Sequence, residues 1–492
     1  MKKKLAAALL FVCLLFGFSA CGGGDYIVDE SKKLSSYEIT AKFDEQTKTL
    51  EALETFKWKN DSGETLDEAV FHLYPNAFRV DAVYKPVSKQ DFTSAYPNGA
   101  SYGGIEISSV TAGGNEVDFS VGGEDKNLLV VPLGRDLPPG GETVIEIKFT
   151  DTLPNAAHRY GYTDNNYSFG NWYPVLCVRE NGGWVTTPYY SNGDPFYSVM
   201  ANYTVSVTYP AWFTAAATGD FSVTKSGGAA TFTSTALTVR DFAFVLSDKF
   251  KVKTLEAGET TVGYYYFDDD NAEENLRVAA EAVKTFGEMI GGYPYDGLCV
   301  AQTDFVYGGM EYPNLVYVAS GLDDATMKQV IVHEIAHQWW YNLVGNNQAA
   351  HAWMDEGLTE FTTALFFKKN TQYSDEINFD KTVRTLERNY TMFVDVMESM
   401  GNADTSMNRA VNEYATEQEY VCMTYTKGTL MFENLMFSIG QNRFEKCLKR
   451  YFRDFRCGVA TPDGMIESFQ KACGVNLQGF FSEWLEGKVV IG

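Results

Sequence analysis

The chain has 492 residues, 45% of them hydrophobic and 15% aromatic, and carries a formal net charge of −24 at pH 7. That length predicts two or three domains with large cores. So acidic a surface repels the phosphates of nucleic acids and anionic headgroups, which argues against a nucleic-acid-binding protein. The charge by itself identifies no substrate.

The start of the chain is typical of an export signal rather than of a folded element. Three lysines at residues 2–4 precede an apolar stretch, residues 5–18, that is too short to span a bilayer comfortably. The following Phe18-Ser19-Ala20-Cys21 resembles a bacterial lipobox, in which the cysteine is lipidated after cleavage. We expect a signal peptide over residues 1–20 and a lipidated cysteine with its tether over residues 21–36.

Lipid on Cys21 would hold the protein outside the cytoplasmic membrane, at the cell surface or in the periplasm. The membrane would then be contacted only through this anchor. The alternative is ordinary secretion with cleavage nearby. The sequence indicates no particular oligomeric state.

Residues 37–253 show the two-residue period of β-strands. Ile145, Ile147 and Phe149 alternate with Glu146 and Lys148, and clusters of Gly, Asn, Asp and Pro separate segments of this kind. Such alternation indicates strands with one buried and one solvated face. We expect an antiparallel β-sandwich over this part of the chain.

From residue 254 onward the hydrophobic period becomes that of helices. The pattern predicts helices over residues 272–290, 326–344 and 353–369. The second is apolar around nearly its whole circumference, so it should lie inside a domain rather than on its surface.

That buried helix carries His333-Glu334-Ile335-Ala336-His337. Residues four apart lie on one face of a helix, so both imidazoles can reach one ion. Zinc accepts imidazole nitrogens and carboxylate oxygens, and a catalytic zinc keeps one position for water. Glu334 adjoins the first ligand and is placed to take a proton from that water.

A third ligand is needed, and Glu356 is the stronger candidate. It begins the next predicted helix, 19 positions after His337, and two helices joined by a short loop can pack antiparallel. The other histidines in the chain supply the alternatives: His72, His158 and His351. We expect one Zn²⁺ per chain, held by His333, His337 and Glu356.

Three motifs make the chain resemble the gluzincin aminopeptidases, the relatives of aminopeptidase N and leukotriene hydrolase. The His-Glu-Ile-Ala-His segment with Glu356 matches the zinc motif of that family in residues and spacing. Tyr307-Gly308-Gly309-Met310-Glu311 resembles its substrate-strand motif, and Tyr425-Thr426-Lys427-Gly428 resembles the segment with its catalytic tyrosine. Asn171-Trp172-Tyr173-Pro174 and Gly193-Asp194-Pro195-Phe196-Tyr197 look like motifs of the shorter bacterial members.

The resemblance implies an α+β multidomain protein, with a thermolysin-like zinc peptidase domain over residues 254–492. That domain would have a small mixed sheet and a helical lobe, and it would release N-terminal residues from peptides. Tyr425 would stabilise the tetrahedral oxyanion. The substrate would bind along Gly308, Gly309, Met310 and Glu311, and Glu311 would bind its free amine. Apart from the resemblance, Asp355 and Glu360 flank Glu356, so either could accept the outer ring N–H of a liganding histidine; the alternative is that they are solvent-facing carboxylates at a helix start.

Two features depart from the family's pattern. Tyr312 stands where the substrate motif usually has asparagine, and the N-terminal half shows no evident counterpart of the glutamine or glutamate that helps to bind the amine. The chain also continues only a short way past Tyr425, which predicts an open cleft and leaves a zinc endopeptidase as one alternative. The other is a non-catalytic peptide-binding lipoprotein, although structural zinc usually closes its shell with a fourth Cys or His.

Overall fold

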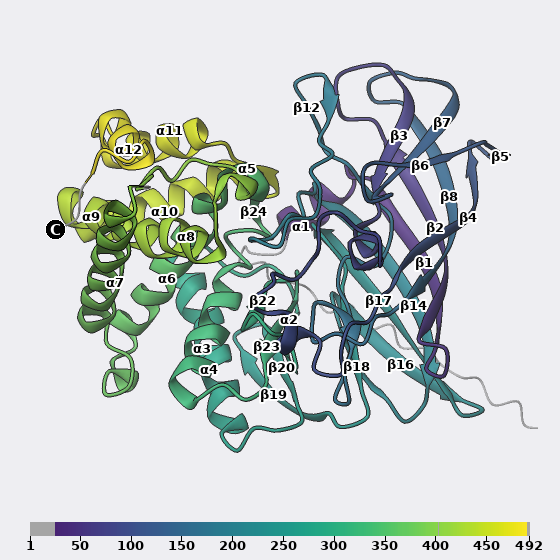
Figure 1. The fold of residues 1–492 in the computed structure, drawn as a ribbon, viewed down its shortest axis with the longest axis horizontal. Helices are drawn as coiled ribbons and strands as arrows, with labels where there is room; N and C mark the ends of the chain where they lie inside the picture. Colours follow the sequence, from purple (N-terminus) through teal and green to yellow (C-terminus); the bar gives the residue numbers. More distant parts are fainter. Residues whose placement is uncertain (1–24, 402, 490–492) are drawn as a thin grey trace, which may run out of the picture.

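The computed structural model describes residues 25–401 and 403–489, so the expected signal peptide and Cys21 lie outside the described residues. Strands dominate the N-terminal half of this part and helices the C-terminal half (Figure 1). The expected α+β fold class is confirmed. Among the described residues, no helix has the length and apolar character needed to cross a membrane.

A large twisted sheet, eight-stranded within residues 25–401, forms the outer wall of the N-terminal half. In β8 (Glu142–Thr152), Ile145, Ile147 and Phe149 are buried while the residues between them are exposed, as the two-residue period predicts. The spatial order of the strands is β16 (Asp220–Ser226), β17 (Ala229–Val239), β14 (Ala201–Pro210), β1 (Ser36–Asp44), β2 (Thr49–Lys59), β8, β4 (Gly104–Ala112) and β5 (Asn115–Glu116).

The expectation of a purely antiparallel sheet is wrong at one place, because β1 and β14 run parallel. Short hairpins force neighbouring strands to be antiparallel, whereas β1 and β14 are far apart in the chain and are under no such constraint.

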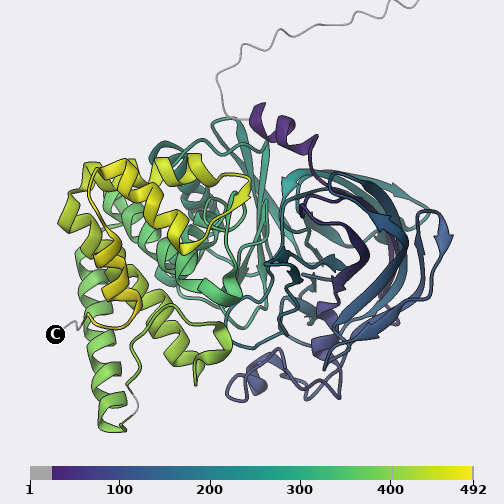
Figure 2. The same cartoon turned by 90° about the horizontal axis from the view of Figure 1, so that it is seen from above.

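Two smaller sheets pack inside this wall, which curves around them (Figure 2). Aromatic rings fill the space between the layers. The ring of Phe244 stacks on that of Phe169, with the ring centroids 4.2 Å apart, and its centroid lies 5.3 Å from that of Phe232 in the wall. One sheet consists of β15 (Thr214–Ala217), β18 (Phe244–Ser247), β10 (Tyr167–Phe169) and β9 (Tyr160–Tyr162). The other consists of β11 (Val175–Leu176), β3 (Leu66–His72), β7 (Leu128–Leu137) and β6 (Ser120–Gly122).

A mixed sheet begins the C-terminal half, and its inner strands are buried on both faces. In β21 (Gly297–Thr303), Leu298 and Val300 belong to the core shared with the helices, whereas Cys299 and Ala301 belong to the core of the N-terminal half. The sheet therefore joins the two halves, and its edges are where a site between them can form. Its spatial order is β19 (Lys251–Ala257), β20 (Thr260–Tyr266), β21 (Gly297–Thr303), β23 (Leu315–Ala319) and β22 (Gly309–Met310).

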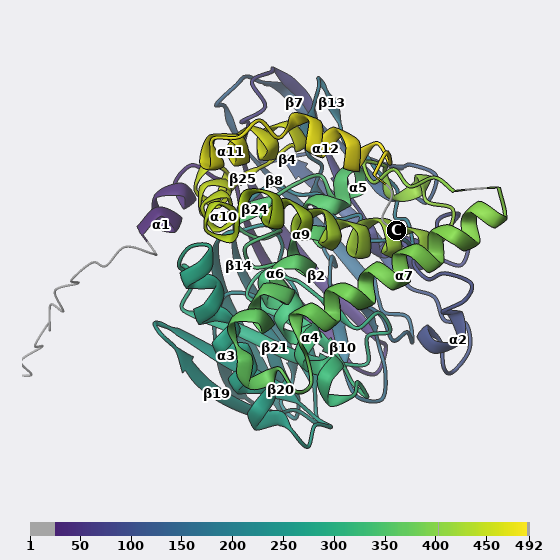
Figure 3. The ribbon, with the colours of Figure 1, turned by 90° about the vertical axis from the view of Figure 1, so that its left-hand side faces the viewer.

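Helices cover the other side of this sheet and continue into a helical lobe (Figure 3). The predicted helix over residues 272–290 is confirmed as α3 (Ala272–Met289), and it packs on both α4 (Asp324–Ala336) and the sheet. The third predicted helix begins three residues late, as α6 (Glu356–Lys369), because residues 352–354 form a 3₁₀ turn. The lobe includes α7 (Phe379–Ser399), α8 (Glu417–Val421), α9 (Lys427–Ile439), α10 (Gln441–Phe455), α11 (Pro462–Cys473) and α12 (Gln478–Leu485).

Candidate active site

Helix α4 begins with a strong cap and ends earlier than its apolar pattern predicts. The Asp323 carboxylate accepts the backbone N–H groups of residues 325 and 326 at 3.1 Å. The predicted continuation to residue 344 is wrong: the helix ends at Ala336, and the N–H groups of residues 342–344 bond to carbonyls five residues back. This wider turn brings the Trp340 carbonyl to 2.9 Å from Nδ1 of His337, so leaving the helix is what orients that imidazole.

The three expected zinc ligands face one another. The Nε2 atoms of His333 and His337 lie 3.1 Å apart, and Oε2 of Glu356 lies 3.3 and 3.2 Å from them, respectively. A tetrahedral shell with bonds of about 2.0 Å requires its donor atoms to be about 3.3 Å apart. Two imidazole nitrogens and a carboxylate oxygen at this spacing fit zinc in donor type and in size.

The outer nitrogens of both histidines have partners that fix the rings. Nδ1 of His333 donates to Oε2 of Glu360 at 2.9 Å, and Nδ1 of His337 donates to the Trp340 carbonyl. In each ring this leaves the lone pair of Nε2 free for a metal. Of the two carboxylates expected in this role, Glu360 fills it, whereas Asp355 accepts the backbone N–H of Glu356 at the start of α6.

The side chain of Glu334 extends from α4 toward β22, the expected substrate strand. A Cβ atom on Gly309 would come within 2.2 Å of Oε1 of Glu334, so only glycine leaves room for this carboxylate beside the strand. Burial raises the pKa of Glu334 to about 7. A carboxylate with that pKa is suited to take up and return a proton near neutral pH.

Tyr425 reaches the site from the turn before α9. Its ring stacks on His333 with the centroids 6.0 Å apart, and burial raises the pKa of its phenol well above the ordinary value, so the hydroxyl stays a donor. Gly428, three residues after Tyr425, has a packing role. A Cβ on Gly428 would lie 2.7 Å from Cα of Gly357, so glycines at both positions let α6 and α9 touch and carry Tyr425 to the Glu356 side of the site.

The expected substrate strand divides its side chains between the site and the core. Gly309 and Glu311 line the cavity, and Glu311 is 3% exposed. Met310 packs into the core of the N-terminal half, and the carbonyl of Gly308 accepts the N–H of Ala319. Burial and the nearby Asp194 raise the pKa of Glu311 well above its usual range. Since β22 is an edge strand, an extended peptide backbone can add beside it.

Asp194 is a site residue that sequence reasoning missed. Carboxylate oxygens of Asp194, Glu311 and Glu356 lie within 4.8 Å of one another, so the N-terminal half does contribute an acidic group to the site. The available signal was the Gly193-Asp194-Pro195-Phe196-Tyr197 motif, to which no role was assigned. Gly193 has a φ of +65°, and a Cβ there would lie 2.5 Å from the Tyr420 hydroxyl, so glycine allows this loop to reach the helical lobe.

Tyr312, which replaces the family's asparagine, faces away from the site. Its hydroxyl donates to Oδ1 of Asn171 at 2.7 Å, and Gly170 leaves room for it, since a Cβ there would lie 1.9 Å from the hydroxyl oxygen. The Asn171 amide in turn donates to Asp241 at 2.5 Å. The Asn171-Trp172-Tyr173-Pro174 motif thus anchors the end of the substrate strand to the N-terminal half.

The three alternative histidines lie away from the zinc ligands. His72 stacks on Tyr74 in the N-terminal half, His158 packs against Phe305, and His351 bonds to Oδ1 of Asn408 at 2.8 Å.

The site residues line a cavity of about 260 Å³ between the two halves of the molecule. Negative charge dominates it, because five carboxylates face two imidazoles. Burial opposes positive charge on His337, but Glu356 and Glu311 outweigh that effect and raise its pKa to about 10. A site with this set of charges favours the binding of cations. Its lining is Asp194, Tyr307, Gly309, Glu311, Thr326, Gln329, Val330, His333, Glu334, His337, Glu356, Glu360 and Tyr425.

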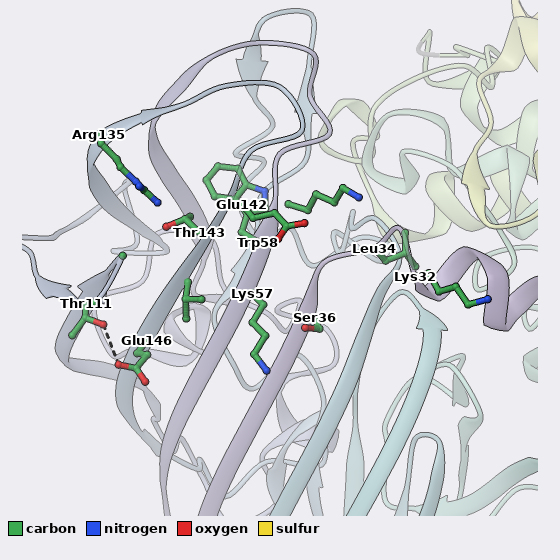
Figure 4. A pocket seen from close by; sticks show the side chains of 14 residues that line it. Lys32, Leu34, Ser36, Lys57, Trp58, Thr111, Arg135, Glu142, Thr143 and Glu146 are labelled. Carbon is green, nitrogen blue, oxygen red and sulfur yellow. Dashed lines mark hydrogen bonds between the residues drawn. The ribbon is translucent and has the colours of Figure 1, made fainter.

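A larger hollow of about 690 Å³ lies on the outer wall of the N-terminal half (Figure 4). Its side chains mix cations with carboxylates, such as Arg135, Lys57 and Glu142, and Thr111 donates to Glu146 at 3.2 Å. The described lining includes no histidine or cysteine, so it offers neither an imidazole nor a thiolate ligand for zinc. The expected metal ligands and Glu334 line the smaller cavity.

The chain is similar in sequence to known peptidases. Residues 275–484 match the peptidase family M1 domain. Leucine aminopeptidase 2 of Yarrowia lipolytica is 25% identical over 398 residues, which are 72% of this chain and 55% of that protein. Aminopeptidase B of Mus musculus is 29% identical over 222 residues, 42% of this chain and 33% of that protein. The chain therefore spans about half, or less, of the length of the curated relatives it matches.

Solved structures show the same fold across both halves. The M1 zinc metallopeptidase from Deinococcus radiodurans aligns over 93% of this chain and 94% of that chain, with a TM-score of 0.62 and 17% identity. A mutant of that protein bound to a Tyr-Ser-Ala substrate aligns to the same extent.

Proposed function

We propose that this protein is a zinc-dependent aminopeptidase that releases N-terminal residues from peptides, in line with the match of residues 275–484 to the peptidase family M1 domain. One observation carries the proposal. Beside the zinc ligands His333, His337 and Glu356, two further carboxylates, Glu311 and Asp194, converge at the end of the edge strand. The ammonium group of a peptide with a free N-terminus supplies a positive charge that can pair with these two carboxylates.

Zinc, when bound, supplies a Lewis acid that polarises the scissile carbonyl and acidifies water. Glu334 takes the proton from the attacking water and passes it to the leaving nitrogen, since it is buried beside the ligands and has a pKa near neutrality. Tyr425 donates its phenolic hydrogen to the oxyanion that develops on the carbonyl oxygen. Glu311 and Asp194 accept hydrogen bonds from the substrate ammonium and so fix which peptide bond reaches the reacting groups.

Glu311→Ala tests whether a free amine is recognised. We expect kcat/KM for a free-amine peptide to fall by about 30- to 1,000-fold, because an ion pair worth roughly 2–4 kcal/mol is lost. Cleavage of the N-acetylated form of the same peptide should hardly change, since it brings no charge for Glu311 to bind. The measurement is kcat/KM for the matched peptides on wild type and variant.

The wild-type measurements in that experiment decide between an aminopeptidase and an endopeptidase. An aminopeptidase should cleave the acetylated peptide poorly. If wild type cleaves both peptides equally well, the protein is an endopeptidase and the amine site has no such role.

Tyr425→Phe should lower kcat by about 10²- to 10³-fold with little change in KM, because its hydrogen bond forms mainly in the transition state. Zinc content should stay the same, because the phenol is not one of the three ligands. A change confined to KM would show instead that Tyr425 contacts the substrate in the ground state.

We further propose that the mature protein is a lipoprotein held outside the cytoplasmic membrane by acyl chains on Cys21. The lipobox-like Phe18-Ser19-Ala20-Cys21 supports this. Cys21→Ala should move the protein from the membrane fraction to the soluble fraction or block its processing. Unchanged membrane association of the variant would count against the anchor.

A further inference from the structure

A buried arginine stands behind the amine-binding carboxylates. Arg159 immediately precedes β9, is 6% exposed, and pairs through Nη1 with Oδ1 of Asp194. Burial opposes its charge, but Asp194 outweighs that effect and raises the pKa of the guanidinium further above its already high value. Both members of the pair are therefore charges taken largely out of water, a costly arrangement when one partner is missing.

The guanidinium also lies between two aromatic rings from different parts of the chain. Phe196 follows Asp194 in the same loop, with its ring centroid 4.9 Å away, and Phe305 lies 5.4 Å away in the segment that leads to β22. Arg159 thus contacts both the loop that carries Asp194 and the segment that leads to Glu311. A planar guanidinium can stack on rings and donate to a carboxylate at once, which an ammonium cannot do.

Without this pair, Asp194 would be poorly held. Its carboxylate lies within 4.8 Å of those of Glu311 and Glu356, and like charges at such distances repel. Arg159 does not line the cavity, whereas its partner Asp194 does. It therefore offsets the repulsion without occupying the space of the substrate.

We propose that Arg159 is a positioning residue for amine recognition, which fixes the Asp194 carboxylate beside Glu311 so that a substrate ammonium meets two oriented acceptors. The inference rests on the proposed aminopeptidase function. It assigns part of the choice of substrate to an ion pair built entirely within the N-terminal half.

The test compares wild type with Arg159→Met, Arg159→Lys, Asp194→Asn and the Arg159→Met/Asp194→Asn double variant. For each, kcat and KM are measured on one peptide in free and N-acetylated form, together with zinc content and the thermal unfolding midpoint. Arg159→Met should lower the free-to-acetylated ratio of kcat/KM by about 10- to 100-fold, mainly through KM, because the ammonium is bound in both the ground and transition states. Arg159→Lys should recover part of the loss, and zinc content should not change.

A matched control separates positioning from general stability. Arg240 is 2% exposed and donates to the backbone carbonyls of Tyr341, Asn342 and Ser198, but it does not line the cavity. Arg240→Met should lower the unfolding midpoint and leave the free-to-acetylated ratio unchanged. If Arg159→Met keeps the wild-type ratio within about twofold, the positioning role is wrong.

The double variant keeps the proposal testable if Arg159→Met does not fold, because it leaves no unpaired buried charge. Its ratio should equal that of Asp194→Asn, since Arg159 acts only through Asp194. A further drop in the double variant would show that Arg159 acts independently and would overturn the inference. The free-to-acetylated ratio of kcat/KM in wild type tests the proposed aminopeptidase function separately. If wild type prefers the free peptide and Arg159→Met keeps that preference, only the role of Arg159 is wrong.

Discussion

Replacing Glu334 with glutamine is expected to lower kcat by about 10²- to 10⁴-fold while the zinc stays bound, the range for a well-placed acid–base group. The amide has nearly the same shape as the carboxylate, so the close packing against Gly309 should survive. What it loses is the ability to take a proton from water and return it to the leaving amine. KM should change little, because the lost interaction belongs to the transition state.

The experiment needs zinc analysis and a carboxylate control. Glu433→Gln removes a half-buried carboxylate on α9 that does not line the cavity, and it should keep wild-type kcat. If Glu334→Gln retained near-normal kcat with full zinc, another group would have to be the base.

Removing the metal should abolish turnover, and His337→Ala should lose both zinc and activity. His337 supplies one of three donors, and the Trp340 carbonyl holds its Nδ1, so the variant loses a ligand that is already oriented in the folded protein. Zinc binds the folded site and stabilises it, so the metal-free protein should unfold at a lower temperature. Protons compete with zinc for the same imidazole nitrogens, so affinity should fall on acidification.

His351→Ala is the matched histidine control, because His351 bonds to Asn408 and lies outside the cavity lining. It should keep one zinc per chain and normal turnover. Re-addition of zinc should restore the chelated wild type and not His337→Ala. Full activity of metal-free protein would remove the zinc mechanism altogether.

The sequence determined the parts of the site that depend on local geometry. His333, Glu334 and His337 occupy one helix, whose period of 3.6 residues places the two imidazoles together whatever surrounds them. Glu356 begins the helix after a short connection, so its approach to the same ion also follows from the sequence. The alternation of buried residues in β8 is likewise local, since successive side chains of a strand point to opposite faces.

The tertiary structure decided what depends on packing between distant segments. Helix α4 ends at Ala336, where the chain turns and places the Trp340 carbonyl beside Nδ1 of His337. The apolar residues beyond that point are compatible with this turn as well as with a helix, so their pattern does not predict where the helix ends. Asp194 reaches the site only because Gly193 fits against Tyr420, and Tyr312 turns away only because Gly170 leaves room for its ring.

The same division explains why the candidate metal ligands could be predicted from the sequence, whereas only part of the candidate amine site could. Metal ligands recur at fixed spacings because one helix face must present them. Asp194 and Glu311 belong to different halves of the protein, and their meeting depends on how the inner strands of the mixed sheet join the cores of those halves. The spacing of the two residues in the sequence does not predict that contact. Packing of the cores brings them together, and the length of the chain between them does not.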